Sequence, residues 1–324
     1  RLSVHHRIIT KAFEDRLVLA PVSFKPNDRV LESAAGSGIW ALEFNAQNNL
    51  PLGIECIDIS DKQFPQKYPS NIHFSVQSVT NLPKEWQNSF SFIHQRLLIA
   101  SMNDSLWIIA INQLFEALIP GGWVELVEIE AKVLAYGSGH CSQRLVSLIT
   151  SLYKERGIIG DVGVYLPNLL KEVGFIDIHC ETRRVPIRRS LNNDGLNRSK
   201  HWYDLWMGMK TPILAGGGYG IVKTEVEFDQ LLQGCLNEWD ESDDANTTYY
   251  TIMARKTSHE VVHLLFVMIL PWLGALIRTV GLSGVDKTAF QVVVRRLLRR
   301  LILKSTSNFL SYLVSQSMIA QGRN

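Results

Sequence analysis

The sequence has few cysteines, and those it has are scattered. Cys56, Cys141, Cys180 and Cys235 form no C-x-x-C pair and no Cys/His spacing of the kind that zinc ligands show. This pattern argues against a disulfide framework and predicts no metal site. It also favours a reducing compartment, in which cysteines stay as free thiols.

An excess of charge of one sign is also missing. The chain has 33 basic and 31 acidic residues and a net charge of +2 at pH 7, so it has no general attraction for polyanions and we expect no nucleic-acid partner. It opens RLSVHHRIIT, without an initiator Met and without the basic-then-apolar pattern of a secretory signal. We therefore expect a trimmed intracellular product in the cytoplasm, with the nucleus as the alternative.

Two patterns of apolar residues alternate along the chain. Short apolar runs predict strands, and apolar residues three or four apart predict helices. The predicted strands cover 29–31, 52–57, 72–76, 90–93, 123–129, 175–182 and 247–255, and the predicted helices cover 2–19, 39–48, 61–67, 104–118, 141–156, 165–173 and 224–239. This alternation indicates an α/β fold, with helices on both faces of a parallel sheet.

The segment between the last two predicted strands is long and aromatic. Its part from about 186 to 246 holds Trp202, Tyr203 and Trp206, and a glycine-rich loop at 216–220. That composition suits a helical lid over a pocket. The alternative is that these aromatic residues pack the insertion onto the sheet.

The end of the chain, 258–324, is predicted to be a helical extension of a domain that covers 1–257. Residues 261–277 are almost all apolar, near the lower limit for a membrane-spanning helix, and paired arginines follow in KTAFQVVVRRLLRRLILK. Three interpretations remain open: a helical hairpin packed on the domain, a weak membrane anchor within 261–304, and an ill-ordered extension. A membrane or a protein partner could bind here.

The stretch VLESAAGSGIWALEF contains the most informative turn. It satisfies the dinucleotide-binding pattern as Gly36-x-Gly38-x-x-Ala41, and it is also close to the acid-plus-glycine turn of S-adenosylmethionine enzymes. Asp58, at the end of the next predicted strand, suits the ribose of either cofactor. Glu32 discriminates between them, because a carboxylate at this strand end repels a pyrophosphate but attracts the ammonium of an amino acid. The turn therefore favours a cofactor with an amino-acid portion.

From about residue 4 to 257, the sequence resembles one family. The motifs are, in chain order, HHRIITKAFEDRLVLAP, VLESAAGSGIWALEF, GIECIDIS, SFSFIHQR, LIPGGWVELVEIE, YLPNLLKEVGF and TTYYTIMARK. They resemble those of the fungal class I S-adenosylmethionine-dependent methyltransferases related to the secondary-metabolism regulator LaeA. The resemblance implies a Rossmann-like, mostly parallel seven-stranded sheet with a reversed final strand. It also implies S-adenosyl-L-methionine as the cofactor.

The same resemblance implies roles for single residues. The methionine portion of the cofactor would lie on Glu32 and the glycine turn, the ribose on Asp58, and the adenine near Ser78 and Val79. The full set of expected cofactor-binding residues is Glu32, Ala34, Ala35, Gly36, Gly38, Asp58, Ile59, Ser78, Val79 and Gln95.

Three positions depart from the family pattern. Ala34 stands where the first glycine is usual, Ser78 where an aspartate usually meets the adenine amine, and Ser91 where an acid is usual. A hydroxyl that replaces a carboxylate loses a charge-assisted hydrogen bond. Each departure is therefore expected to weaken cofactor binding.

Methyl transfer from a sulfonium requires an in-line approach of the acceptor and exclusion of water, but no metal. A hydroxyl or ammonium acceptor also needs a base, and His94 in FIHQR, at the end of the fourth predicted strand, is the candidate. The alternative for His94 is a cap of the strand or a hydrogen bond to a loop carbonyl. Trp40 could offer its aromatic face to the sulfonium, or pack against the neighbouring helix.

These patterns predict an enzyme that methylates an oxygen or a nitrogen of a small, apolar or aromatic metabolite. Two other functions remain open. The first is a cofactor-binding regulator of secondary metabolism that acts through protein partners, which the departures at Ser78 and Ser91 would explain. The second is an NAD-dependent oxidoreductase, which only the glycine pattern supports.

Overall fold

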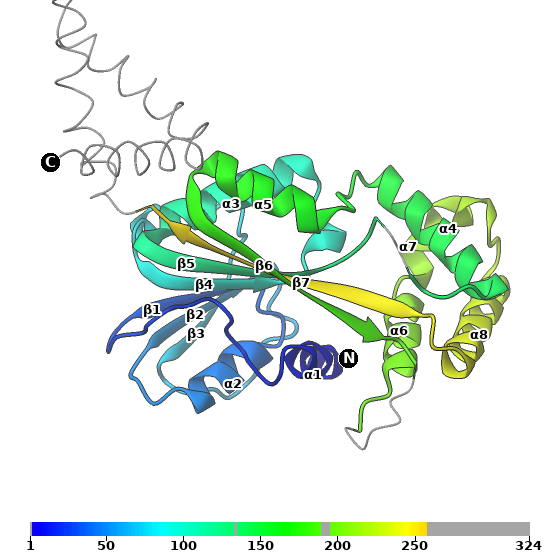
Figure 1. The fold of residues 1–324 in the computed structure, drawn as a ribbon, viewed down its shortest axis with the longest axis horizontal. Coiled ribbons are helices and arrows are strands. Elements are labelled where there is room, and N and C mark those ends of the chain that lie inside the picture. Colours follow the sequence, from blue (N-terminus) through cyan, green and yellow to red (C-terminus); the bar gives the residue numbers. More distant parts are fainter. Residues whose placement is uncertain (1, 133–134, 189–194, 258–324) are drawn as a thin grey trace, which may run out of the picture.

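A seven-stranded sheet with helices on both faces forms the centre of the molecule (Figure 1). The computed structural model describes residues 2–132, 135–188 and 195–257. The strands are β1 (Arg29–Ser33), β2 (Gly53–Asp58), β3 (Ile72–Val76), β4 (Phe90–Arg96), β5 (Leu118–Ile129), β6 (Phe175–Pro186) and β7 (Asn246–Lys256). The predicted α/β class and all seven predicted strands are confirmed.

The strand order is β3-β2-β1-β4-β5-β7-β6, and β7 runs antiparallel to both of its neighbours. The five strands β1 to β5 are parallel, and β1 lies between β2 and β4. Successive strands are therefore added on one side of β1 as far as β3, and on its other side from β4 onward. The loops that follow β1, β2 and β4 meet at one edge, and in open α/β sheets this is where ligands bind.

Two apolar cores flank the sheet, because successive residues of a strand point to opposite faces. Leu31 and Ile93 belong to the core beneath α3 (Asp104–Ala117) and α5 (Val162–Val173). Val30 and Phe92 belong to the core beneath α2 (Ile39–Gln47). The central strands are buried on both faces, which explains why they read as continuous apolar runs.

Two of the predicted helices differ from the structure. The first, α1 (Leu2–Ala12), ends well before Pro21, because Glu14 and Asp15 adopt left-handed backbone angles and turn the chain. The stretch 61–67 forms no helix. Pro65 interrupts it by removing a backbone donor and disfavouring helical angles at the residue before it.

The insertion folds into helices that pack together beyond one end of β6 and β7 (Figure 1). Its elements are α6 (Arg198–Met207), α7 (Lys210–Ala215), a short 3-10 turn at Gly217–Gly220 and α8 (Glu225–Glu241), and they join α4 (His140–Glu155). Trp202 and Trp206 are each 2% exposed and surround Tyr136 with ring centroids 5.6 and 6.1 Å away. These aromatic residues therefore pack the insertion into the same apolar core that lies beneath α3 and α5.

The predicted extension at 258–324 lies outside the described residues, and so does the arginine-rich segment within it. Within the described ranges, no helix has the length and apolar character needed to cross a membrane.

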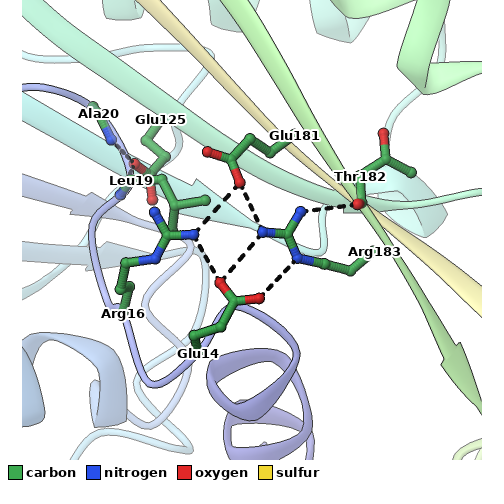
Figure 2. Close-up of polar contacts among 8 residues, drawn as sticks. All are labelled: Glu14, Arg16, Leu19, Ala20, Glu125, Glu181, Thr182 and Arg183. Carbon is green, nitrogen blue, oxygen red and sulfur yellow. Dashed lines mark hydrogen bonds and ion pairs between the residues drawn. The ribbon is translucent and has the colours of Figure 1, made fainter.

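The chain between α1 and β1 is fastened to the sheet by two sets of polar contacts (Figure 2). Glu14 and Arg16 form an exposed cluster with Glu181 and Arg183 of β6. Beneath it, the Oε2 atom of Glu125 on β5 accepts hydrogen bonds from the backbone N–H groups of Leu19 and Ala20, both at 2.7 Å. Exposed ion pairs contribute little to stability, so the buried carboxylate is the stronger fastening.

Replacing Glu125 by alanine should lower the free energy of unfolding by about 2–4 kcal/mol, because two buried N–H groups lose their acceptor. Chemical denaturation monitored by circular dichroism would measure this loss. The matched control is Glu116→Ala, which removes an exposed carboxylate and should change stability by no more than about 0.5 kcal/mol. Equal effects of the two substitutions would show that Glu125 does not fasten the segment.

Candidate active site

The turn between β1 and α2 has the tight geometry that its sequence suggests. Gly36 and Gly38 have φ angles of 54° and 67°. A Cβ added at Gly38 would lie 2.4 Å from the Phe74 ring, so no larger residue fits there without movement. Ala34 also has a positive φ, 57°, which costs a residue with a Cβ about 1–2 kcal/mol. The departure at Ala34 therefore places strain in the turn.

Asp58 ends β2 and joins the turn to the neighbouring strand. Its Oδ2 atom accepts a hydrogen bond from the Gly36 N–H at 2.9 Å, and its Oδ1 atom accepts one from the Ser60 N–H at 3.2 Å. The next residue, Ile59, is 77% exposed, which is unusual for a large apolar side chain. A carboxylate and an apolar side chain thus stand side by side at this edge of the sheet.

A cavity of about 860 Å³ opens over this edge, and we call it the large cavity. Its volume is within the range of small-molecule sites. Seven of the ten expected cofactor-binding residues line it, namely Ala34, Ala35, Gly36, Asp58, Ile59, Ser78 and Val79. Its other lining residues are Leu2, Ser3, His5, His6, Ser37, Ile39, Gln63, Gln77, Thr80, Arg96, Leu97, Leu98, Ser101, Met102 and Leu106.

The residues of the large cavity suit a nucleoside cofactor. The Oγ atom of Ser37 is buried beside it and has no hydrogen-bond partner among the described residues. A buried hydroxyl without a partner is costly, so a ligand atom there would be favourable. Ser78 also borders the cavity, where its hydroxyl shares a hydrogen bond of 2.8 Å with that of Thr80. A hydroxyl therefore stands where the family usually has a carboxylate.

Three expected residues do not line the large cavity: Glu32, Gly38 and Gln95. Glu32 is 1% exposed, and its Oε2 atom accepts a hydrogen bond of 2.5 Å from the Nδ1 atom of His94. Gln95 is fully buried and accepts a hydrogen bond from the Ser33 hydroxyl at 3.0 Å. Gly38 lies against the Phe74 ring and shapes the turn without lining the cavity. Their expected contacts with the cofactor remain predictions.

His94 differs most from its expected place. Its ring is 1% exposed and stacks on Trp40 with centroids 4.0 Å apart. Both rings border a small separate cavity of about 20 Å³ beside Glu125. His94 therefore does not line the large cavity in this structure, because its ring is held by its contacts with Glu32 and Trp40, and its role as the base remains a prediction. Trp40 packs in the core and does not border the large cavity.

One wall of the large cavity comes from α1, which the sequence did not suggest. His5 and His6 both line it. His5 is 6% exposed, and its Nε2 atom lies 3.1 Å from the Tyr249 hydroxyl. Its ring also meets those of His201 and Trp202 on α6, at 4.7 and 6.0 Å. The insertion thus supports α1 from outside, and its described part contributes no lining residue, so its role as a lid remains a prediction.

The opposite wall is the loop after β4, and Glu128 holds it. Leu97 turns the chain with a φ of 59°, and the two carboxylate oxygens of Glu128 accept hydrogen bonds from the N–H groups of Leu98 and Ile99 at 2.9 and 3.1 Å. Glu128 is fully buried, and this burial raises its pKa to about 8 despite the two hydrogen bonds, which lower it.

The raised pKa of Glu128 predicts a pH dependence of stability. Between pH 4.5, its ordinary pKa, and pH 8, the folded state holds a proton that the unfolded state releases. The free energy of unfolding should therefore fall as pH rises through this window. Glu128→Gln has no proton to release, so the wild type should lose more stability than this variant between pH 5 and 8.5.

Thermal unfolding at a series of pH values would measure the difference between the two proteins. Glu116→Gln, which changes an exposed carboxylate, serves as the control and should follow the wild type. Parallel curves for the wild type and Glu128→Gln would contradict a raised pKa at this position.

Comparisons with known proteins identify the family. Residues 4–193 match the family model described as a methyltransferase domain. The chain belongs to this methyltransferase family. Membership confirms the predicted resemblance and S-adenosylmethionine as the cofactor, and it favours these over the NAD-dependent oxidoreductase that the glycine pattern alone allowed. The methyltransferase acts on a small-molecule substrate. Within its described residues, no group of three or more His, Cys, Asp or Glu side chains is placed to hold a metal ion.

Several similar proteins come from fungi. The methyltransferase is 34% identical to N-methyltransferase sirN of Leptosphaeria maculans over 200 residues, which are 60% of this chain and 69% of the relative. It is 26% identical to N-methyltransferase tcpN of Claviceps purpurea over 255 residues, 74% of this chain and 90% of the relative. It is also 24% identical to the secondary metabolism regulator LAE1 of Hypocrea atroviridis over 222 residues, 64% of this chain and 61% of the relative.

Proposed function

We propose that this methyltransferase transfers the methyl group of S-adenosylmethionine to a nitrogen of an apolar small metabolite. The observation that carries the proposal is the large cavity, which combines the glycine turn, Asp58 and an apolar wall at one edge of the sheet. The relatives sirN and tcpN, both named N-methyltransferases, support nitrogen as the acceptor.

The turn side of the large cavity would hold the cofactor. The Asp58 carboxylate can accept hydrogen bonds from both ribose hydroxyls. Ile59 and Val79 offer apolar surface to the adenine, and Ser37 offers its unpartnered hydroxyl. When bound, the cofactor supplies an electrophilic methyl group on a positively charged sulfur.

The remaining wall would hold the acceptor. Leu97, Leu98, Met102 and Leu106 form an apolar surface on the β4 side of the cavity. Burial of apolar surface gives about 25 cal/mol per Å², so this wall favours an apolar acceptor and excludes water. The protein's contribution to the reaction is then to align the acceptor nitrogen with the methyl group. His5, which lines the large cavity, would take the proton that the nitrogen loses, and His94 remains the alternative base.

The cofactor assignment predicts that S-adenosylhomocysteine binds and that Asp58→Asn weakens this binding by about 10- to 100-fold, because the ribose loses a charged acceptor. Isothermal titration calorimetry would measure both affinities. Asp61→Asn is the matched control, since it changes an exposed carboxylate three residues further on, and it should leave the affinity unchanged. Absence of binding to the wild type would refute the proposed function.

The catalytic assignment is tested separately. Full-length protein incubated with S-adenosylmethionine carrying a labelled methyl group should transfer the label to apolar amines or amides, and mass spectrometry would locate it on nitrogen. Matched alcohols should remain unlabelled. Tight cofactor binding without transfer to any acceptor in such a series would favour a cofactor-binding regulator, and the relative LAE1 is named a secondary metabolism regulator.

A further inference from the structure

We propose that Arg96 binds the α-carboxylate of the cofactor's methionine portion, so that Arg96 and Asp58 together set the direction in which the cofactor lies. This inference rests on the proposed function. It concerns a residue that sequence reasoning did not single out.

The position of Arg96 in the sheet places it at the correct end of the cavity. It is the last residue of β4 and lines the large cavity. In the pairing of β1 with β4, Ser33 lies opposite Gln95. Arg96 therefore stands one residue further, beside Ala34, where the glycine turn begins. This is the part of the turn expected to contact the amino-acid portion of the cofactor.

The charges of the large cavity are separated by the turn. Among the described residues that line the large cavity, the ionisable side chains are those of two histidines, Asp58 and Arg96. Asp58 ends β2, Arg96 ends β4, and β1 lies between these two strands. The cofactor carries ribose hydroxyls in its middle and a carboxylate at its far end. A carboxylate is repelled by Asp58 and attracted by a guanidinium, so only one direction satisfies both residues.

The Arg96 guanidinium already has an orienting neighbour. Its Nη1 atom donates a hydrogen bond of 2.9 Å to Nδ1 of His6, and Nε2 of His6 faces the Glu43 carboxylate at 2.5 Å. Nδ1 must carry a lone pair to accept from Arg96, and burial with the Arg96 charge lowers the pKa of His6. A neutral imidazole therefore holds one side of the guanidinium fork and leaves its other N–H groups for a ligand.

The charge of Arg96 has no direct anionic partner among the described residues. No carboxylate forms an ion pair with it in the described part of the chain, and the two nearby carboxylates are engaged by histidines, Glu32 by His94 and Glu43 by His6. Burial lowers the pKa of Arg96, as expected of a cation removed from water without direct neutralisation. A ligand carboxylate would form charge-assisted, bidentate hydrogen bonds with it.

The test compares two ligands and three proteins by calorimetry. The ligands are S-adenosylhomocysteine and its decarboxylated analogue, which keeps the adenosine, the sulfur and the amine. The proteins are the wild type, Arg96→Gln and Arg29→Gln. Arg29 is the matched control because it is the first residue of β1, at the end of the strand away from the glycine turn. It forms an ion pair with Glu55 at 3.2 Å.

Loss of the ligand carboxylate should weaken binding to the wild type and to Arg29→Gln by about 10- to 100-fold. Arg96→Gln should weaken S-adenosylhomocysteine by the same factor and leave the analogue within about twofold of its wild-type affinity. Arg96→Lys, which keeps the charge but not the fork, should recover part of the lost affinity.

Equal affinities of the two ligands for the wild type would overturn the proposal without any variant, and this comparison stands even where Arg96→Gln does not fold. Equal weakening of both ligands by Arg96→Gln would overturn it too, and would leave the proposed function intact. Failure of the wild type to bind either ligand would overturn the proposed function together with this inference.

Discussion

Two buried carboxylates on β5 hold the walls of the cavity at the edge of the sheet. Glu125 accepts from Leu19 and Ala20 on one face, and Glu128 accepts from Leu98 and Ile99 on the other. Their odd spacing of three residues places them on opposite faces of the strand. Burial raises the pKa of both carboxyl groups, and each offsets the cost of its burial by satisfying two backbone donors that an irregular segment would otherwise leave without partners. The segment leading from α1 and the loop after β4 are both positioned in this way.

The fold could be predicted from the sequence because its strands are buried on both faces and its turns are rich in glycine and proline. Boundaries were less certain where tertiary contacts compete with local pattern. The apolar spacing of α1 continues past Ala12, yet the chain turns at Glu14 and Asp15, and Glu125 binds the N–H groups of Leu19 and Ala20 beyond that turn. In the stretch 61–67, Pro65 prevents the helix that the local pattern predicts.

The site was predictable where the backbone dictates it. The turn at 34–38 and Asp58 follow from strand ends, and the structure brings them together around one cavity. Side-chain direction was not predictable in the same way. His94 and Arg96 are two residues apart on β4, yet only Arg96 reaches the large cavity, while His94 is held by Glu32 beneath the turn. A charged residue at the end of a strand that is otherwise wholly buried was the available signal for Arg96.

The cavity is assembled from parts of the chain that are synthesised far apart in time. Its α1 wall is fastened by Tyr249 of β7, and the segment that follows α1 is fastened by Glu125 of β5 and Arg183 of β6. The turn and Asp58 belong to the first 60 residues, and the strands that carry them, β1 and β2, pair with each other, with β3 and with β4. During synthesis the cofactor-binding half can therefore form early, whereas α1 must wait for β6 and β7 to leave the ribosome. Until then the nascent chain exposes the apolar face of α1, which makes this helix the last part of the site to close.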